Sequence, residues 1–261
     1  NISTAAALVT AAAGAPVAKH GNRAASSRCG SADVLESLGV NLDLDPAALG
    51  RLLDEVGLAF MFAPAHHPAM RHAVPVRKAL GVRTVFNLLG PLTNPAGVRR
   101  QLLGVYAPDV VGLVAETLRD LGCVRALVVH GHDGQDELTL TGETTVVELR
   151  DGELHDSVVA PEAVGLARCA PGELQGGDAG DNARLLVATL AGEPGPRTDA
   201  VLLNAAGALL VAGVADSLAV GVARAREAVG DGSAAHLLGR LVEASHDLAS
   251  PLDDRLAGGD A

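Results

Sequence analysis

The sequence predicts an α/β protein with a largely parallel central sheet that is flanked by helices. Short apolar runs alternate with helical segments over the first half of the 261-residue chain, an antiparallel excursion follows, and the remainder is mainly helical. Strands that are joined by crossover-length helices form parallel sheets with both faces covered. Because ligands of such sheets bind beyond the carboxyl ends of the strands, we expect the functional site there.

The first half of the chain is expected to alternate helices and strands. An Ala-rich segment with polar residues at its start opens the sequence, and Pro46 stands at the first turn of a later helix, where proline is favourable. Gly39 and Gly81 follow helical segments and suit the left-handed conformation in which helices often end. We expect helices over residues 3–13, 32–38, 46–56, 68–80 and 110–121, and strands over residues 16–20, 58–63, 101–107 and 126–131.

The second half is expected to contain a hairpin and then helices. Residues 144–149 alternate polar and apolar side chains, and Asp151-Gly152 is typical of a two-residue hairpin turn, which predicts an antiparallel excursion at the sheet edge. Helices are expected over residues 183–191, 199–212, 217–229 and 234–249. We predict a catalytic α/β domain over residues 1–250, with remnants of a helical domain, and a polar tail over residues 251–261.

Charge and composition exclude several classes of function. The chain carries 20 Lys and Arg against 31 Asp and Glu, a net charge of −11, which disfavours nucleic acid or an anionic membrane as a partner. A phosphorylated substrate remains compatible, since a bound divalent cation reverses the local charge. Three cysteines stand far apart, and no secretory leader or span of ~20 apolar residues is present, so we expect reduced thiols and a cytoplasmic location.

The first polar cluster lies between an expected strand and the next helix. Its glycines allow a ligand to approach the backbone, and hydroxyls beside a helix start favour an anion, to which a lysine adds charge. A capped, solvated loop is the alternative reading, with Ser31 or Asp33 as the cap. The cluster comprises Lys19, His20, Gly21, Asn22, Arg23, Ser26, Ser27, Gly30 and Ser31.

The second cluster follows the strand that ends near residue 131. Adjacent Asp136 and Glu137 offer two hard oxygen ligands, and Mg²⁺ commonly binds one or two carboxylates together with substrate phosphates. The alternative is an acidic surface turn. A zinc site at His130, His132 and Asp133 is disfavoured, because no further Cys or His stands at structural-site spacing.

Two further segments are candidates for a small-molecule site. Arg77 lies ten positions after His67, and its planar guanidinium suits a carboxylate, either of a ligand or of a salt bridge within the protein. Residues 87–95 are rich in Gly, Pro and Asn, which predicts a rigid loop that either only connects or also encloses a pocket. The sequence lacks GxSxG, Walker and GxGxxG motifs. These features suit transfer chemistry on a phosphorylated substrate but leave the reaction open.

Several long segments resemble the anthranilate phosphoribosyltransferase family of tryptophan biosynthesis. They are residues 19–39 (KHGNRAASSRCGSADVLESLG), 66–95 (HHPAMRHAVPVRKALGVRTVFNLLGPLTNP) and 128–139 (VVHGHDGQDELT), with GGDAGDNARLL and DAVLLNAAGALLVAG further on. The resemblance covers nearly the whole chain. It implies transfer of the phosphoribosyl group from phosphoribosyl pyrophosphate to the amine of anthranilate, with Mg²⁺, on a nucleoside phosphorylase/phosphoribosyltransferase-like C-terminal domain.

The resemblance also implies roles for individual residues. Phosphoribosyl pyrophosphate would contact Asn1, Ser3, Thr4, Lys19, Gly21, Asn22, Ser26, Ser27 and Ser31. Magnesium would be held by Ser3, Asp136 and Glu137. Anthranilate would contact His20, Asn22, His67, Arg77, Gly90 and Pro91, with Arg77 on its carboxylate. No residue is assigned as a general base, because an aryl amine is already uncharged at neutral pH.

The chain departs from the family at its start. The opening NISTAAA resembles the segment that follows the family's GTGGD phosphate loop, and neither that loop nor the N-terminal helices are among these 261 residues. We therefore expect a truncated chain whose small helical domain is mostly missing, and a homodimer in the complete protein. The alternatives are a pyrimidine nucleoside phosphorylase-like enzyme and a non-catalytic, nucleic-acid-binding relative, the second of which the acidic charge disfavours.

Overall fold

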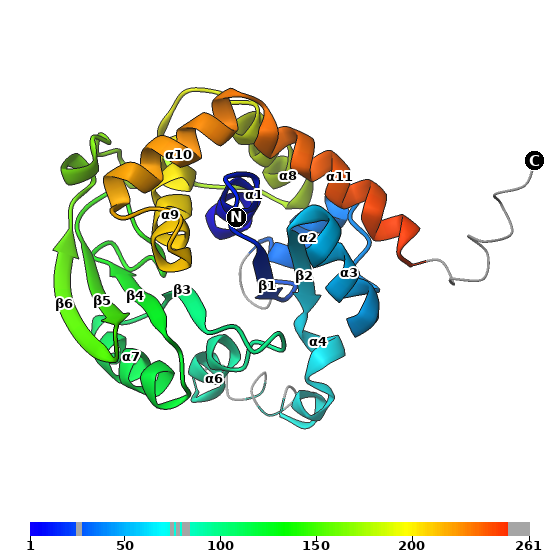
Figure 1. Ribbon diagram of the computed structural model, residues 1–261, viewed down its shortest axis with the longest axis horizontal. Helices are drawn as coiled ribbons and strands as arrows, with labels where there is room; N and C mark the ends of the chain where they lie inside the picture. The colour runs from blue at the N-terminus through cyan, green and yellow to red at the C-terminus, as the bar shows by residue number, and fades with distance from the viewer. Residues whose placement is uncertain (25–27, 74–75, 77–78, 80–83, 250–261) are drawn as a thin grey trace, which may run out of the picture.

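The computed structural model describes residues 1–24, 28–73, 76, 79 and 84–249. Helices pack around two small sheets, and β6 (Glu153–Val159) lies at the outer edge of the molecule (Figure 1). The helices of the first half are α1 (Ile2–Ala12), α2 (Ser31–Ser37), α3 (Pro46–Val56), α4 (Ala63–His66), η1 (Pro68–His72), α6 (Phe86–Leu92), η2 (Pro108–Val110) and α7 (Val111–Asp120). Those of the second half are η3 (Pro161–Val164), η4 (Pro171–Leu174), α8 (Ala179–Leu190), α9 (Pro196–Ala212), α10 (Leu218–Gly230) and α11 (Ser233–Asp247).

The strands form one parallel pair and one mixed sheet. The strands are β1 (Val17–Gly21), β2 (Leu58–Phe62), β3 (Arg100–Gly104), β4 (Arg125–Gly131), β5 (Thr144–Arg150) and β6 (Glu153–Val159). β1 pairs with β2 and β3 with β4 in parallel, whereas β4–β5 and β5–β6 are antiparallel. The α/β class, the flanking helices and the antiparallel edge excursion are therefore confirmed.

A single central sheet was predicted, but the strands of the described residues form two sheets. One has the order β1-β2 and the other β3-β4-β5-β6. Helices join them: α1 packs on β1, β2 and α9, and α9 packs in turn on β3 and β4. The strand order depends on these long-range contacts, which periodicity along the chain does not contain. The space between β1 and β3 belongs to a cavity of about 1780 Å³.

Local chemistry explains several element boundaries. Asp45 caps α3 by accepting a hydrogen bond from the Ala48 N–H at 2.8 Å, and the helix ends at Gly57, which has φ +88°. At the β5–β6 hairpin, Asp151 (φ +53°) and Gly152 (φ +81°) both have positive φ, as the two-residue turn requires.

Two predicted segments differ from the structure. Residues 68–80 were expected to be helical, and their first part is the 3-10 helix η1, while most of the rest lies outside the described residues. Residues 87–95 were expected to be a loop, yet helix α6 occupies most of them and contains Pro91. The Asn87 side chain accepts a hydrogen bond from the Thr84 N–H at 2.9 Å, and the Thr93 hydroxyl donates to Leu89 O at 2.9 Å, so polar side chains close both ends of this helix.

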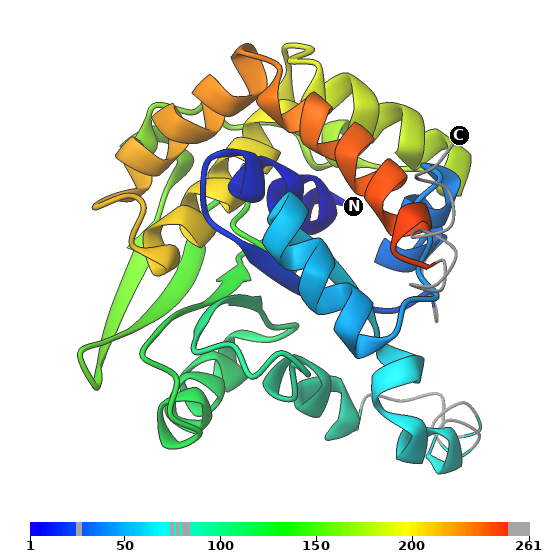
Figure 2. The ribbon, with the colours of Figure 1, turned by 45° about the vertical axis from the view of Figure 1, so that its right-hand side comes forward.

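The apolar core is layered around the two sheets. Helix α1 lies enclosed by α9, α10 and α11 (Figure 1), and its buried face belongs to the largest cluster together with α3, β2 and α11. A second cluster joins α9 to β4 and β5, and a third packs α7 on the opposite face of the mixed sheet. In Figure 2, α6 and α7 lie below the sheets, away from the layer formed by α8–α11. No helix of the described part is long and apolar enough to cross a bilayer.

Candidate active site

The carboxyl ends of four strands line one cavity, as the fold class predicted. Its lining includes β1 and the residues that follow it, the segment after β2, the end of β3 and the acidic loop after β4, which we define as residues 132–138. Helices α1, α6 and α9 complete the enclosure. Polar residues that are distant in the sequence thus face the same volume of about 1780 Å³.

Ser3, Lys19 and Glu137 meet at this cavity, each from a different element. The Ser3 N–H donates to Glu137 Oε1 at 3.1 Å, and Lys19 Nζ donates to Ser3 Oγ at 3.3 Å. Ser3 stands in the first turn of α1, where free N–H groups favour a carboxylate. Asp136 lines the same cavity beside Glu137. The structure therefore brings all three predicted metal ligands and the predicted lysine together.

Burial perturbs both charged partners of this cluster. Burial, and then the neighbouring Asp136, raises the pKa of Glu137 to about 7, although Ser3 and Lys19 act against the rise. Burial also lowers the pKa of the Lys19 ammonium, while Glu137 and Asp136 oppose that decrease. Strongly perturbed groups in a cavity are candidates for function. The cluster is therefore a candidate site for charged ligands.

The donor set of the acidic loop suits Mg²⁺. Asp136 and Glu137 provide adjacent carboxylates, and Ser3 adds a hydroxyl oxygen, which are the hard ligands that Mg²⁺ prefers. In the described ranges no three His, Cys, Asp or Glu side chains gather as a metal site. His130 contacts Val105 O through Nδ1 at 2.8 Å and is buried, which does not support the disfavoured zinc reading.

The loop after β1 is folded tightly by two glycines. A Cβ on Gly21 would lie 2.3 Å from Ser31 Oγ, and a Cβ on Gly30 would lie 2.5 Å from the Ala24 nitrogen. Ser31 Oγ donates to Asn22 O at 3.3 Å and thereby joins the two ends of the loop. The two glycines therefore allow parts of the loop to approach each other closely. Asn22 lines the cavity.

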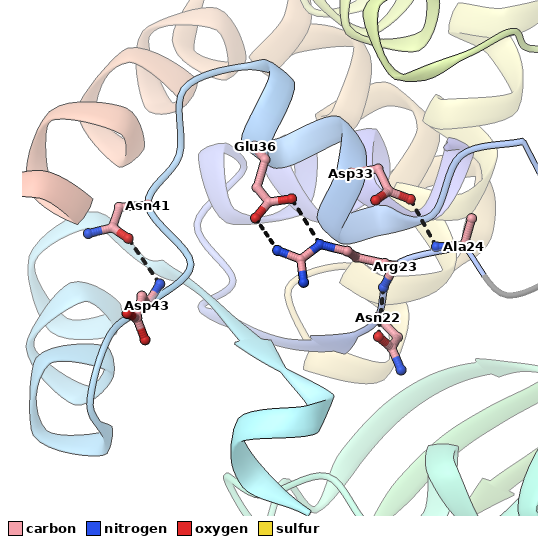
Figure 3. A network of polar contacts seen from close by, with 7 residues as sticks. All are labelled: Asn22, Arg23, Ala24, Asp33, Glu36, Asn41 and Asp43. Atoms are coloured by element: carbon pink, nitrogen blue, oxygen red, sulfur yellow. Dashed lines mark hydrogen bonds and ion pairs between the residues drawn. The ribbon is translucent and has the colours of Figure 1, made fainter. Parts of the chain in front are cut away.

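Arg23 and Asp33 hold this loop against α2. Arg23 forms an ion pair with Glu36 (Figure 3). Its guanidinium also lies 4.6 Å from the centre of the Phe62 ring. The Asp33 carboxylate accepts hydrogen bonds from the Ala24 N–H at 2.9 Å and the Gly30 N–H at 2.8 Å. These bonds lower the pKa of Asp33. Arg23 is thus a structural residue of the loop.

The variant Asp33→Asn is expected to destabilise the protein at neutral pH but much less in acid. Because the native pKa of Asp33 lies below its ordinary value of 3.8, its contribution is complete above that value and is lost as the pH falls through the native pKa. Urea denaturation from about pH 3 to 7 measures this difference. Asp54→Asn, which alters an exposed carboxylate on α3, is the control, and an equal effect of both variants would refute the role of Asp33.

Two histidines form part of the cavity lining. The rings of His20 and His67 lie 5.0 Å apart in an edge-on arrangement. Their buried Nε2 atoms have no hydrogen-bond partner within the described residues. Burial, and then His67, lowers the pKa of His20, against a backbone hydrogen bond with Gly90. Gly90 and Pro91, which resemblance assigns to the same substrate, line the cavity from α6.

The remaining predicted residues either do not line the cavity or lie outside the described residues. Asn1 is exposed and precedes α1. The Thr4 side chain is buried, because a helical step of one residue turns it away from Ser3. Its hydroxyl has no hydrogen-bond partner among the described residues. Ser31 touches the loop rather than the cavity. Ser26, Ser27 and Arg77 lie outside the described residues.

Sequence reasoning missed several residues that build the site. One of them is Asn182, whose Nδ2 donates to Asn1 Oδ1 at 2.9 Å. Asn94, by contrast, belongs to the predicted segment 87–95, and its Nδ2 donates to Ala18 O at 3.0 Å, which ties the residues after α6 to β1. Gly104 and Asn204 contact the acidic loop. A polar residue inside an apolar helix was the only available signal for Asn204.

Comparisons with known proteins agree with this geometry. A family described as "Glycosyl transferase family, a/b domain" matches residues 1–235. The anthranilate phosphoribosyltransferase of Methylobacterium radiotolerans is 56% identical over 255 residues, covering 98% of this chain and 74% of the relative, and that of Laribacter hongkongensis is 53% identical over 250 residues, covering 96% and 73%.

Solved structures show the same similarity. The anthranilate phosphoribosyltransferase of Thermus thermophilus is 52% identical, with a TM-score of 0.89 over 94% of this chain and 73% of its own. The Saccharomyces cerevisiae enzyme in complex with PRPP and Mg is 28% identical, with a TM-score of 0.86 over 95% of this chain and 70% of its own. The chain belongs to the anthranilate phosphoribosyltransferases, within the glycosyl transferase family whose α/β domain it matches.

Proposed function

We propose that this chain transfers the phosphoribosyl group of phosphoribosyl pyrophosphate to the amine of anthranilate, in tryptophan biosynthesis, through the cavity at the strand ends. The single observation that carries the proposal is the meeting of Lys19, Ser3 and Glu137 beside Asp136 at one cavity. A lysine and two carboxylates suit a diphosphate that arrives with a divalent cation. The family supplies the identity of the substrates.

Asp136, Glu137 and Ser3 would hold Mg²⁺ in this proposal. When bound, the cation neutralises charge that develops on a departing diphosphate. The Lys19 ammonium adds a fixed positive charge on the same side, and the first-turn N–H of Ser3 holds the Glu137 carboxylate in place. Lys19, Gly21, Asn22 and the serines of the loop would bind the phosphates and the ribose, together with Asn1 and Thr4, as the resemblance implies.

The acceptor is proposed to lie against the histidine lining. Burial is the largest cause that lowers the pKa of His20 and of His66, and it favours their neutral forms. Neutral rings with Gly90 and Pro91 form an uncharged surface for an aromatic ring, while Arg77 would pair with the carboxylate. The nitrogen lone pair forms the bond to the anomeric carbon, the bond from that carbon to pyrophosphate breaks, and the amine proton passes to solvent.

Loss of anthranilate fluorescence tests the proposed activity. The chain is mixed with anthranilate, phosphoribosyl pyrophosphate and Mg²⁺, and we expect a decrease in fluorescence that needs all three components. Phosphorolysis of uridine or thymidine under the same conditions is the control for the nucleoside phosphorylase alternative. Phosphorolysis without any anthranilate consumption would contradict the proposal.

Arg77→Ala is expected to raise the KM for anthranilate by about tenfold or more and to leave the KM for phosphoribosyl pyrophosphate nearly unchanged. A hydrogen bond to a charged group contributes about 1.5–3 kcal/mol, which corresponds to this change. Steady-state kinetics with each substrate varied in turn measures the two values. Equal increases in both KM values would show that Arg77 does not bind the carboxylate of anthranilate.

We further propose that the complete protein is a homodimer, which the resemblance supports. Light scattering on the complete protein measures its mass, and a monomer at all concentrations would contradict this proposal.

A further inference from the structure

Asn204 is a buried polar residue in the otherwise mostly apolar helix α9. Its side chain is 2% exposed, and its neighbours in the helix, Leu203 and Ala205, are fully buried. A buried amide is costly unless its donors and its acceptor are paired. The partners of Asn204 therefore indicate what this residue does.

The Asn204 amide binds the backbone of Leu138 from both sides. Its Oδ1 accepts from the Leu138 N–H at 3.0 Å, and its Nδ2 donates to Leu138 O at 2.8 Å. The second Nδ2 hydrogen reaches Ala200 O at 2.9 Å, one turn earlier in α9. One side chain thus satisfies both polar groups of a residue that is 66 positions away and fixes its position relative to the helix.

Leu138 directly follows Glu137 and anchors the acidic loop in the core. Its side chain is 1% exposed and belongs to the cluster that joins α9 to β4 and β5. Gly207, one turn after Asn204, leaves room for it, since a Cβ there would lie 2.8 Å from Leu138 Cδ1. The backbone of Leu138 is held by hydrogen bonds and its side chain by packing.

The other end of the acidic loop is also held. Asp133 accepts from the Gln135 N–H at 3.1 Å and from Thr139 Oγ1 at 2.8 Å. The Gly131 N–H donates to Gln135 O at 2.9 Å. Asp136 and Glu137 therefore lie in a short segment between two fixed points, with Asn204 providing the point on the side of Glu137.

We propose that Asn204 is a positioning residue for the metal-binding carboxylates: through the backbone of Leu138 it holds Asp136 and Glu137 at the cavity before any cation binds. This inference rests on the proposed function, because it assigns a task to the same carboxylates. Residues that orient metal ligands typically change metal affinity or activity by about 10–100-fold when they are replaced. In this role Asn204 acts through the backbone of Leu138 and not as a ligand of the cation.

Binding of Mn²⁺ in the presence of phosphoribosyl pyrophosphate, measured by electron paramagnetic resonance, tests the proposal. Asn204→Ala is expected to weaken Mn²⁺ binding by about tenfold or more. It should also raise the KM for phosphoribosyl pyrophosphate more than that for anthranilate. Leu209→Ala is the matched control, because it removes a fully buried side chain from the same helix without touching Leu138.

The outcomes separate a positioning role from a structural one. If Asn204→Ala lowers the affinity and Leu209→Ala, at a similar loss of stability, does not, the proposal is supported. Equal losses in both variants, or none in Asn204→Ala, overturn it. If Asp136→Asn with Glu137→Gln abolishes Mn²⁺ binding while Asn204→Ala does not change it, only this inference fails. If the unaltered chain binds Mn²⁺ no better than that double variant, the proposed function fails with it.

Hydrogen exchange on the unaltered chain provides a second test that does not depend on the folding of a variant. We expect the Leu138 amide to exchange slowly without any cation, because Asn204 already holds it. Rapid exchange that becomes slow only after Mn²⁺ is added would overturn the proposal, since the loop would then be ordered by the metal.

Discussion

Asp136→Asn combined with Glu137→Gln is expected to lower kcat/KM for phosphoribosyl transfer by at least about 100-fold. Several kcal/mol of transition-state stabilisation depend on the proposed cation, and each ~1.4 kcal/mol corresponds to a factor of ten. The fold should persist, because both changes preserve shape and burial already favours the neutral form of Glu137. Anthranilate fluorescence measures the rate, and circular dichroism measures the fold.

The matched control removes two negative charges elsewhere. Glu153→Gln combined with Asp156→Asn alters exposed residues of β6 and gives the same change in net charge. This control should retain full activity. If the Asp136–Glu137 variant also retains it at limiting Mg²⁺, the carboxylates do not act in the reaction.

Gly104→Ala is expected to have the next largest effect, about 100-fold on kcat/KM. A Cβ at Gly104 would lie 1.5 Å from Asp136 O and 2.3 Å from Asp136 C, so the backbone of the acidic loop has to move. A displacement of about 1 Å in an active site can cost about 100-fold in rate. The crowding should also destabilise the protein by about 1–3 kcal/mol or more. Kinetics and urea denaturation measure the two effects.

Gly112→Ala is the control for this prediction. Gly112 lies on the exposed side of α7, and a Cβ there meets no atom of the described residues within 4 Å. An added methyl group in a helix should leave the activity unchanged and stabilise the protein by up to about 1 kcal/mol. A Gly104→Ala variant that is as active as Gly112→Ala would show that the loop tolerates displacement.

The elements of the fold were largely predictable because their signals are local. Pro46 begins α3, and the Asp151-Gly152 turn forms the β5–β6 hairpin, as expected from helix-start and turn chemistry. The division into two sheets was not predictable, because it arises from packing of α1 on α9. Helix α6 was missed because its Gly and Pro content favours a loop, while side-chain hydrogen bonds from Asn87 and Thr93 support a helix.

The site was predictable where its residues cluster in the sequence. Lys19 lies two residues before the end of β1, and Asp136 and Glu137 follow β4, so the rule for parallel sheets places them at one edge. Asn204 could not be found in this way, since its partner lies 66 residues away and a single Asn in a helix carries no spacing signal. Gly104 could not be predicted either, because its role is to leave room for the carbonyl of Asp136, 32 residues further along the chain.

An anomalous difference map from crystals grown with Mn²⁺ and phosphoribosyl pyrophosphate tests the central claim most directly. We expect a manganese peak within coordination distance, about 2.0–2.2 Å, of a carboxylate oxygen from Asp136 or Glu137, with the diphosphate between the metal and Lys19. A diphosphate bound away from Lys19, or manganese bound at other residues, would contradict the assignment of this cavity.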